Sequence, residues 1–174
     1  MTAGAWLELV AVAVAAATAT AGLATGRSPR LHSIGASAFL ALALGVVWFG
    51  NLSPLDDTPR HLVLLLAGAL AVTGGGLVTT QVFALVDRDS PVRRGGEVLR
   101  GGAWIGALER LAVYAALVAG WGPGLAIVLA VKGLGRYPEL RNQEDTGAAE
   151  RFIIGTFTSV LWAVACAGLA TLTP

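Results

Sequence analysis

Three ionisable residues of this 174-residue chain lie inside long apolar stretches: Glu109, Arg110 and Lys132. A charge in the hydrocarbon core of a bilayer costs about 2.5 to 3.5 kcal/mol on insertion scales, so such residues are usually paired or functional. Residues 120–123 (Gly-Trp-Gly-Pro) lie between them and predict a tight turn. Residues equally far from this turn then lie level with one another, so we expect Glu109 to form a salt bridge with Lys132 or Arg136.

A second charged pair, Glu150 and Arg151, stands at the start of the last apolar stretch. Glu150 there interacts favourably with the helix dipole, which is a sufficient structural reason for it. A phosphate or carboxylate would be held by charge and bidentate hydrogen bonds among four cations. These are Arg110, Lys132, Arg136 and Arg151. The alternative is that the same side chains extend to lipid phosphates as topology anchors, and the sequence leaves both interpretations open.

Other chemistry has little support. His32 and His61 fall at opposite membrane faces, and neither has a second His or Cys nearby, so we predict no metal site and no cofactor. Thr156 and Ser159 have no histidine within reach to activate them as nucleophiles. Acid-base chemistry by Glu109 remains possible in principle, but nothing in the sequence favours it over ion pairing.

Composition places these residues in a membrane protein. Hydrophobic residues make up 55% of the chain and charged residues 13%, against about 25% charged in an average soluble domain. The formal net charge is +1 and the arginines are dispersed in connectors, so we predict no nucleic-acid partner. Cys166 is the single cysteine, which excludes an intrachain disulfide and is typical of a small buried apolar residue.

Six apolar segments predict an all-α fold in a single transmembrane domain spanning residues 1–174. Their lengths suit short transmembrane helices joined by turn-rich connectors. The segments are 6–25, 33–50, 61–86, 102–119, 122–136 and 152–172. We assign residues 1–86 to packing and anchorage, and residues 102–172 to a helical hairpin plus a last helix with the charged cluster.

Orientation follows from the positive charges, because Lys and Arg in short loops stay on the cytoplasmic side. Arginines gather in the first, third and fifth connectors. They are Arg27, Arg30, Arg88, Arg93, Arg94, Arg100, Arg136, Arg141 and Arg151. Six crossings with both termini outside, in the plasma (inner) membrane of a bacterium, fit this pattern. The alternative is five crossings with one span over 111–131, which would place Lys132 and the last three arginines outside.

Small residues predict where helices pack closely, since small side chains let backbones approach in lipid. Two helices carry them every four residues. The first set is Ala13, Ala17 and Ala21, and the second is Gly155, Ser159, Ala163 and Ala167. Residues 74–76 (Gly-Gly-Gly) mark either a flexible point or a backbone-contact site in the third helix, and packing is the interpretation that we favour.

The C-terminal half resembles a family of uncharacterised bacterial integral membrane proteins. In that family an Ile-Gly-x-Leu-Glu-Arg helix, a lysine-arginine helix and a helix with Ala-Glu followed by Ile-Gly-Thr-x-x-Ser succeed one another. The corresponding segments here are 105–110, 130–136 and 149–159. The resemblance implies that the positions of interest are Glu109, Arg110, Lys132, Arg136, Glu150, Gly155, Thr156 and Ser159. It implies no activity.

Three classes of function fit these features. The first is a small binding or accessory protein, whose cytoplasmic cationic cluster contacts an anionic lipid head group, another membrane subunit or a second copy of the chain. The second is a small transporter or substrate-capturing component, for which Thr73 and residues 79–81 would line a polar cavity. The third is a lipid-modifying enzyme, for which the acidic cluster is Glu144 and Asp145. We predict the first class, because it requires the fewest special residues, and we expect membrane lipids to be its partners.

Overall fold

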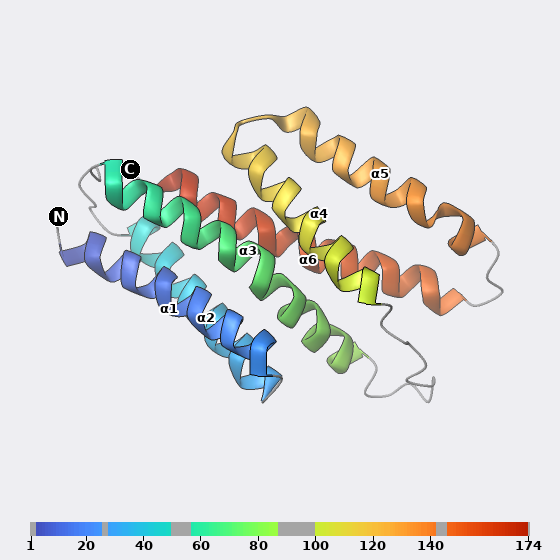
Figure 1. Cartoon of the computed structure of the whole chain (residues 1–174), viewed down its shortest axis with the longest axis horizontal. Helices are drawn as coiled ribbons and strands as arrows, with labels where there is room; N and C mark the ends of the chain where they lie inside the picture. The colour runs from blue at the N-terminus through green and yellow to red at the C-terminus, as the bar shows by residue number, and fades with distance from the viewer. Residues whose placement is uncertain (1–2, 26–27, 50–56, 87–99, 142–145, 174) are drawn as a thin grey trace.

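The computed structural model of the chain is built from helices alone in the residues that it describes, 3–25, 28–49, 57–86, 100–141 and 146–173 (Figure 1). The helices are α1 (Ala3–Thr25), α2 (Pro29–Phe49), α3 (Asp57–Val86), α4 (Arg100–Val118), α5 (Gly122–Arg141) and α6 (Thr146–Leu172). The all-α prediction and the six helical segments are confirmed. Arg27, Arg88, Arg93, Arg94, Glu144 and Asp145 lie outside the described residues.

The turn between α4 and α5 confirms the predicted hairpin. Gly120 adopts a φ of 66°, a left-handed conformation that suits glycine after a helix end. The Gly120 amide donates to the Leu117 carbonyl at 3.0 Å, and the Trp121 amide donates to the Ala116 carbonyl at 2.8 Å. These two bonds form a Schellman motif. The alternative of one continuous span over 111–131 is therefore wrong.

Successive helices run in opposite directions, and the two termini lie at the same end of the bundle (Figure 1). Helix α3 is central, because it packs against α1, α2, α4 and α6. Helices α1 and α2 form a close pair on one side of it. Helix α5 lies at the opposite edge and packs chiefly against α4.

Small residues fill the helix contacts, although not always those that the sequence indicated. In α6, Ser159, Ala163 and Ala167 are buried, as predicted. In α1 the predicted face is wrong, because Ala17 and Ala21 are exposed. The buried face of α1 instead consists of Ala11, Val12, Ala15, Ala16 and Ala19. Small residues lie on almost every face of α1, so the positions of its neighbours α2 and α3 determine which face is buried.

Three side chains from α4 and α6 donate hydrogen bonds to backbone carbonyls of α3. Tyr114 Oη bonds the Leu64 carbonyl at 2.7 Å, and Trp162 Nε1 bonds the Leu70 carbonyl at 3.0 Å. Arg110 Nε bonds the Val72 carbonyl at 3.0 Å. Bonds of this kind substitute for the hydrophobic drive that helices lack within lipid.

Each of these three carbonyls is followed four residues later by a glycine: Gly68, Gly74 and Gly76. A side chain four residues on would lie near the carbonyl, on the same face of the helix. A Cβ at Gly74 would lie 2.5 Å from Trp162 Cζ2, and one at Gly68 would lie 3.1 Å from Tyr114 Cε1. The glycines therefore leave the space that the donor side chains occupy.

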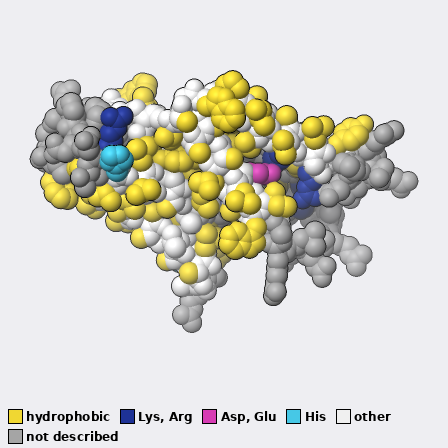
Figure 2. All heavy atoms as spheres, turned by 45° about the horizontal axis from the view of Figure 1, so that its top comes forward, with side chains coloured by type: hydrophobic (Ala, Val, Ile, Leu, Met, Phe, Trp, Pro, Cys, Tyr) yellow, Lys and Arg dark blue, Asp and Glu magenta, His cyan; other side chains and the backbone are white. Residues whose placement is uncertain are grey.

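Three helices in the described residues are long and apolar enough to cross a membrane: Pro29–Phe49, Pro59–Val86 and Ala149–Leu172. The segment Leu9–Thr25 of α1 is apolar but shorter. In α5 the hydropathy is reduced by Lys132, Arg136 and two further charged residues. Large hydrophobic side chains cover much of the face shown in Figure 2. These features are compatible with a membrane protein, and the total of six crossings stays a prediction.

We expect Gly74→Ala to lower the free energy of unfolding by about 2 kcal/mol, because the added methyl group overlaps the Trp162 ring. Gly45→Ala in α2 is the matched control, since a Cβ there meets no atom within 4 Å. The control should leave stability unchanged or raise it by up to about 1 kcal/mol through helix propensity. Unfolding of the detergent-solubilised chain by sodium dodecyl sulfate measures both. Equal effects of the two substitutions would contradict the proposed role of Gly74.

Candidate functional site

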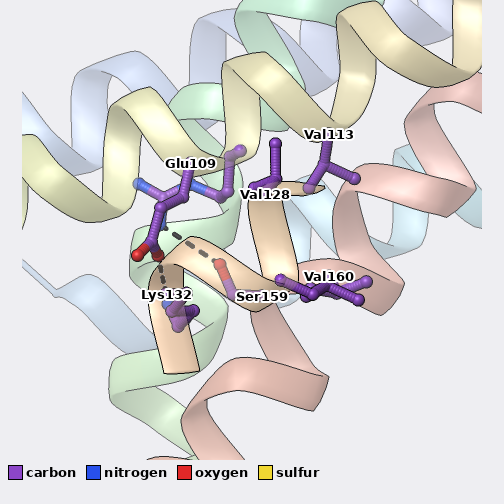
Figure 3. Close-up of a pocket in the computed structure, with 8 residues that line it drawn as sticks. Glu109, Val113, Val128, Lys132, Ser159 and Val160 are labelled. Atoms are coloured by element: carbon purple, nitrogen blue, oxygen red, sulfur yellow. Dashed lines mark hydrogen bonds and ion pairs between the residues drawn. The ribbon is translucent and has the colours of Figure 1, made fainter. Parts of the chain in front are cut away.

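The buried charges lie at the mid-height of the bundle. Glu109 is midway along α4 (Arg100–Val118), and Lys132 is midway along α5 (Gly122–Arg141). Ser159 is at the centre of α6 (Thr146–Leu172). We name Glu109, Arg110, Lys132 and Ser159 the mid-height cluster, because the structure brings them together around one small pocket (Figure 3).

Lys132 and Glu109 form one of the two ion pairs predicted for Glu109. Lys132 Nζ donates to Glu109 Oε2, and the dashed line between them in Figure 3 marks this contact. The two side chains are 18% and 20% exposed, respectively. Charges in such surroundings are weakly screened, so each carboxylate or ammonium group needs its partner. Of the two cations that the sequence offered to Glu109, Lys132 provides the salt bridge.

Arg110 follows Glu109 in the chain but extends toward α3 and α6. Only 9% of the Arg110 surface is exposed to solvent. Nε donates to the Val72 carbonyl at 3.0 Å, and Nη1 donates to Ser159 Oγ at 3.5 Å. A guanidinium has five N–H donors in a planar fork, so these two bonds use part of its capacity. The side chain thus joins three helices at one level.

Three glycines make room for the Arg110 side chain. A Cβ at Gly75 would overlap its aliphatic stem, and a Cβ at Gly76 would lie 3.5 Å from Nη2. Within α4 itself, a Cβ at Gly106 would lie 3.2 Å from Nη1. The glycine run at 74–76 is therefore a contact site, as favoured from the sequence.

The pocket beside these residues is small. Its volume is about 10 Å³, which is about the space that one water molecule needs. The mid-height cluster provides its polar wall, and the rest of the lining is apolar (Figure 3). The apolar residues are Val113, Val128, Leu129 and Val160. A substrate the size of a lipid head group is not enclosed here.

The other predicted cations lie nearer the end of the bundle. Arg136 is exposed one turn beyond Lys132, about 6 Å along α5 at 1.5 Å per residue. Glu150 is exposed and Arg151 half-buried, and Arg151 lies about 12 Å along α6 from Ser159. The structure therefore separates the predicted charge cluster into two levels. We name Arg136, Glu150 and Arg151 the end cluster. Because α6 begins at Thr146, Glu150 lies beyond its first turn, and the dipole interaction predicted for it is wrong.

The remaining predicted positions lie on α6. Gly155 faces α3, where a Cβ would lie 2.8 Å from Phe83 Cζ. Thr156 Oγ1 is buried and has no hydrogen-bond partner among the described residues. Thr156 lies three residues before Ser159 and four before Val160, so it belongs to the helix face that lines the pocket.

Two residues of this region were not identified from the sequence. Tyr114 and Trp162 attach α4 and α6 to α3 through carbonyls of Leu64 and Leu70. Backbone acceptors have no side-chain signature, so the partners were not predictable. The available signal was the polar group of each aromatic ring within an apolar helix, because such groups usually find a hydrogen-bond partner when buried.

Comparisons with protein-family models, curated proteins and solved structures find no match to this chain. The resemblance of the C-terminal half to a family of uncharacterised membrane proteins stays a prediction.

A double-mutant cycle tests the ion pair. We expect Glu109→Gln and Lys132→Gln each to lower the free energy of unfolding by about 3 kcal/mol, because each leaves one charge without its partner. The double variant should recover about 2 kcal/mol of their summed loss. Unfolding by sodium dodecyl sulfate in detergent micelles provides the measurement. Strict additivity of the two single losses would show that the contact contributes nothing.

Proposed function

We propose that this chain is a small multi-pass protein of a bacterial plasma membrane that binds an anionic lipid head group at its cytoplasmic side, as an accessory or binding protein. Six crossings with both termini outside are part of this proposal. The antiparallel order of the helices and the position of both termini at one end support it (Figure 1). The apolar surface of the bundle supports contact with lipid (Figure 2).

The orientation is supported by the arginines near helix ends. Arg30 is the second residue of α2, Arg136 lies near the end of α5, and Arg151 lies near the start of α6. In an antiparallel bundle these positions belong to the same end. Arg60, near the start of α3, lies at the opposite end. Positive residues in short connectors favour the cytoplasmic side, so this end faces the cytoplasm in our proposal.

The observation that carries the lipid proposal is the position of Arg136 and Arg151 on consecutive helices, beyond the mid-height cluster and toward the cytoplasmic end. Lipid phosphates lie at the membrane interface, where such arginines can make bidentate hydrogen bonds. Each basic residue near an anionic membrane surface contributes about 1 kcal/mol of attraction. The mid-height pocket, at about 10 Å³, is too small to enclose a substrate beside the charged residues, which favours binding of the head group at the surface.

The crossing number is tested by cysteine labelling, because Cys166 is the single native cysteine. In a Cys166→Ala background we expect Pro123→Cys, in the α4–α5 turn, to react with a membrane-impermeant maleimide added to intact spheroplasts. Leu31→Cys, at the start of α2, should react only after the membrane is permeabilised. Labelling of both positions from the same side would contradict six crossings.

The lipid site is tested with the variant Arg136→Gln/Arg151→Gln. Native mass spectrometry of the detergent-solubilised chain should show binding of phosphatidylglycerol in preference to phosphatidylcholine. The double variant should weaken phosphatidylglycerol binding about thirtyfold, since two contributions of about 1 kcal/mol are lost.

Arg60→Gln is the matched control, because it removes a cation at the opposite end. It should leave binding of phosphatidylglycerol unchanged. Inorganic phosphate should compete poorly, which distinguishes a lipid from a free anion as the ligand. An equal loss in Arg60→Gln and in the double variant would show that only overall charge matters.

A further inference from the structure

The pocket of the mid-height cluster carries an excess of positive charge. Of the residues that line it, Glu109 is the acid, and Arg110 and Lys132 are the bases. Lys132 pairs with Glu109, while Arg110 bonds a carbonyl and a hydroxyl, which are neutral. A net charge within an apolar bundle is unfavourable unless a counter-charge is close. The lining residues therefore lack one negative charge.

The same pocket has more hydrogen-bond donors than acceptors. Arg110 uses two of its five N–H groups, and Lys132 uses one of its three in the described structure. Ser159 Oγ accepts from Arg110, so its own proton is available to a ligand. Donors that converge beside surplus positive charge match the requirements of an anion.

The size of the pocket limits the ligand. A volume of about 10 Å³ is about that of one water-sized sphere. The apolar side chains Val113, Val128, Leu129 and Val160 form the rest of its lining. A phosphate group, with four oxygens around its phosphorus, exceeds this volume severalfold. A halide is a single sphere whose radius exceeds that of water by a few tenths of an ångström, so a small outward shift of the lining side chains admits it. A water molecule fits and its oxygen accepts two hydrogen bonds, but it cancels no charge.

The geometry points to a binding site for one monatomic anion of the chloride class, held by Arg110, Lys132 and Ser159 between α4, α5 and α6. The anion accepts hydrogen bonds from the three side chains and neutralises the mid-height cluster. This site is independent of the proposed lipid site, because its residues lie about 6 Å or more along the helices from the end cluster.

The test measures thermal unfolding of the full chain, purified in sodium gluconate, as sodium chloride replaces gluconate at constant ionic strength. We expect a saturable rise of the unfolding midpoint, since a ligand that binds the folded state stabilises it. Sodium bromide should act like chloride, and crystals grown in bromide should show an anomalous peak in the pocket. Equal midpoints in chloride and gluconate, or bromide density confined to other places, would overturn the proposal.

Two variants of the ion pair should change the anion affinity in opposite directions. Lys132→Gln removes the excess charge, so the apparent Kd for chloride should rise about tenfold or more. Glu109→Gln increases the excess charge, so the apparent Kd should fall. A role that is only structural would shift both variants in the same direction, and that result would contradict an anion site.

Further variants keep the test decisive if a charge substitution prevents folding. Ser159→Ala removes one hydroxyl at almost unchanged volume and should weaken chloride binding several-fold. Arg60→Gln and Arg136→Gln/Arg151→Gln should leave the chloride Kd unchanged. Because the last variant is the one that tests lipid binding, failure of the lipid proposal and failure of the anion proposal give different patterns. An unchanged chloride Kd in Ser159→Ala would exclude that hydroxyl from the site.

Discussion

The burial of Arg110 is the constraint on which the arrangement of α3, α4 and α6 depends. A guanidinium within an apolar bundle needs acceptors, and here they are the Val72 carbonyl and the Ser159 hydroxyl. The side chain reaches them because Gly75 and Gly76 leave its path open. A different rotation or register of α3 would place a side chain in that path and would leave the charge without partners. Arg110 thus constrains the relative positions of α3, α4 and α6.

Tyr114 and Trp162 likewise donate hydrogen bonds to backbone carbonyls of α3, at other levels of that helix. In lipid, apolar surface gives helices little reason to associate, so close packing and interhelical hydrogen bonds determine the structure. Each of the three donor side chains bonds a carbonyl that has a glycine four residues further along the helix. The glycines of α3 thus give α4 and α6 access to its backbone.

Helix α5 is held differently. It packs chiefly against α4, and the Lys132–Glu109 ion pair joins the two helices at mid-height. Its cations therefore lie at two levels: Lys132 belongs to the pocket, whereas Arg136 belongs to the end cluster. This separation by height is why an anion within the bundle and a lipid head group at its end are distinct proposals.

The sequence alone determined the six helices and the α4–α5 turn, and it limited the partner of Glu109 to Lys132 or Arg136. These features depend on residues that are close in the chain, so they can be predicted from residue order. They are the length of each apolar stretch, a turn that contains Gly and Pro, and the number of residues that separates each charged residue from that turn. The structure selected Lys132 as the partner of Glu109. Only the tertiary structure decided which face of α1 is buried, since Ala17 and Ala15 look alike until neighbours are placed. It also decided the partners of Arg110 and Trp162, because a backbone carbonyl becomes an available acceptor only when another helix lies against it. The tertiary structure also divided the predicted charge cluster into two levels. The level of a residue in the bundle depends on how the helices pack against one another, which residue order does not give.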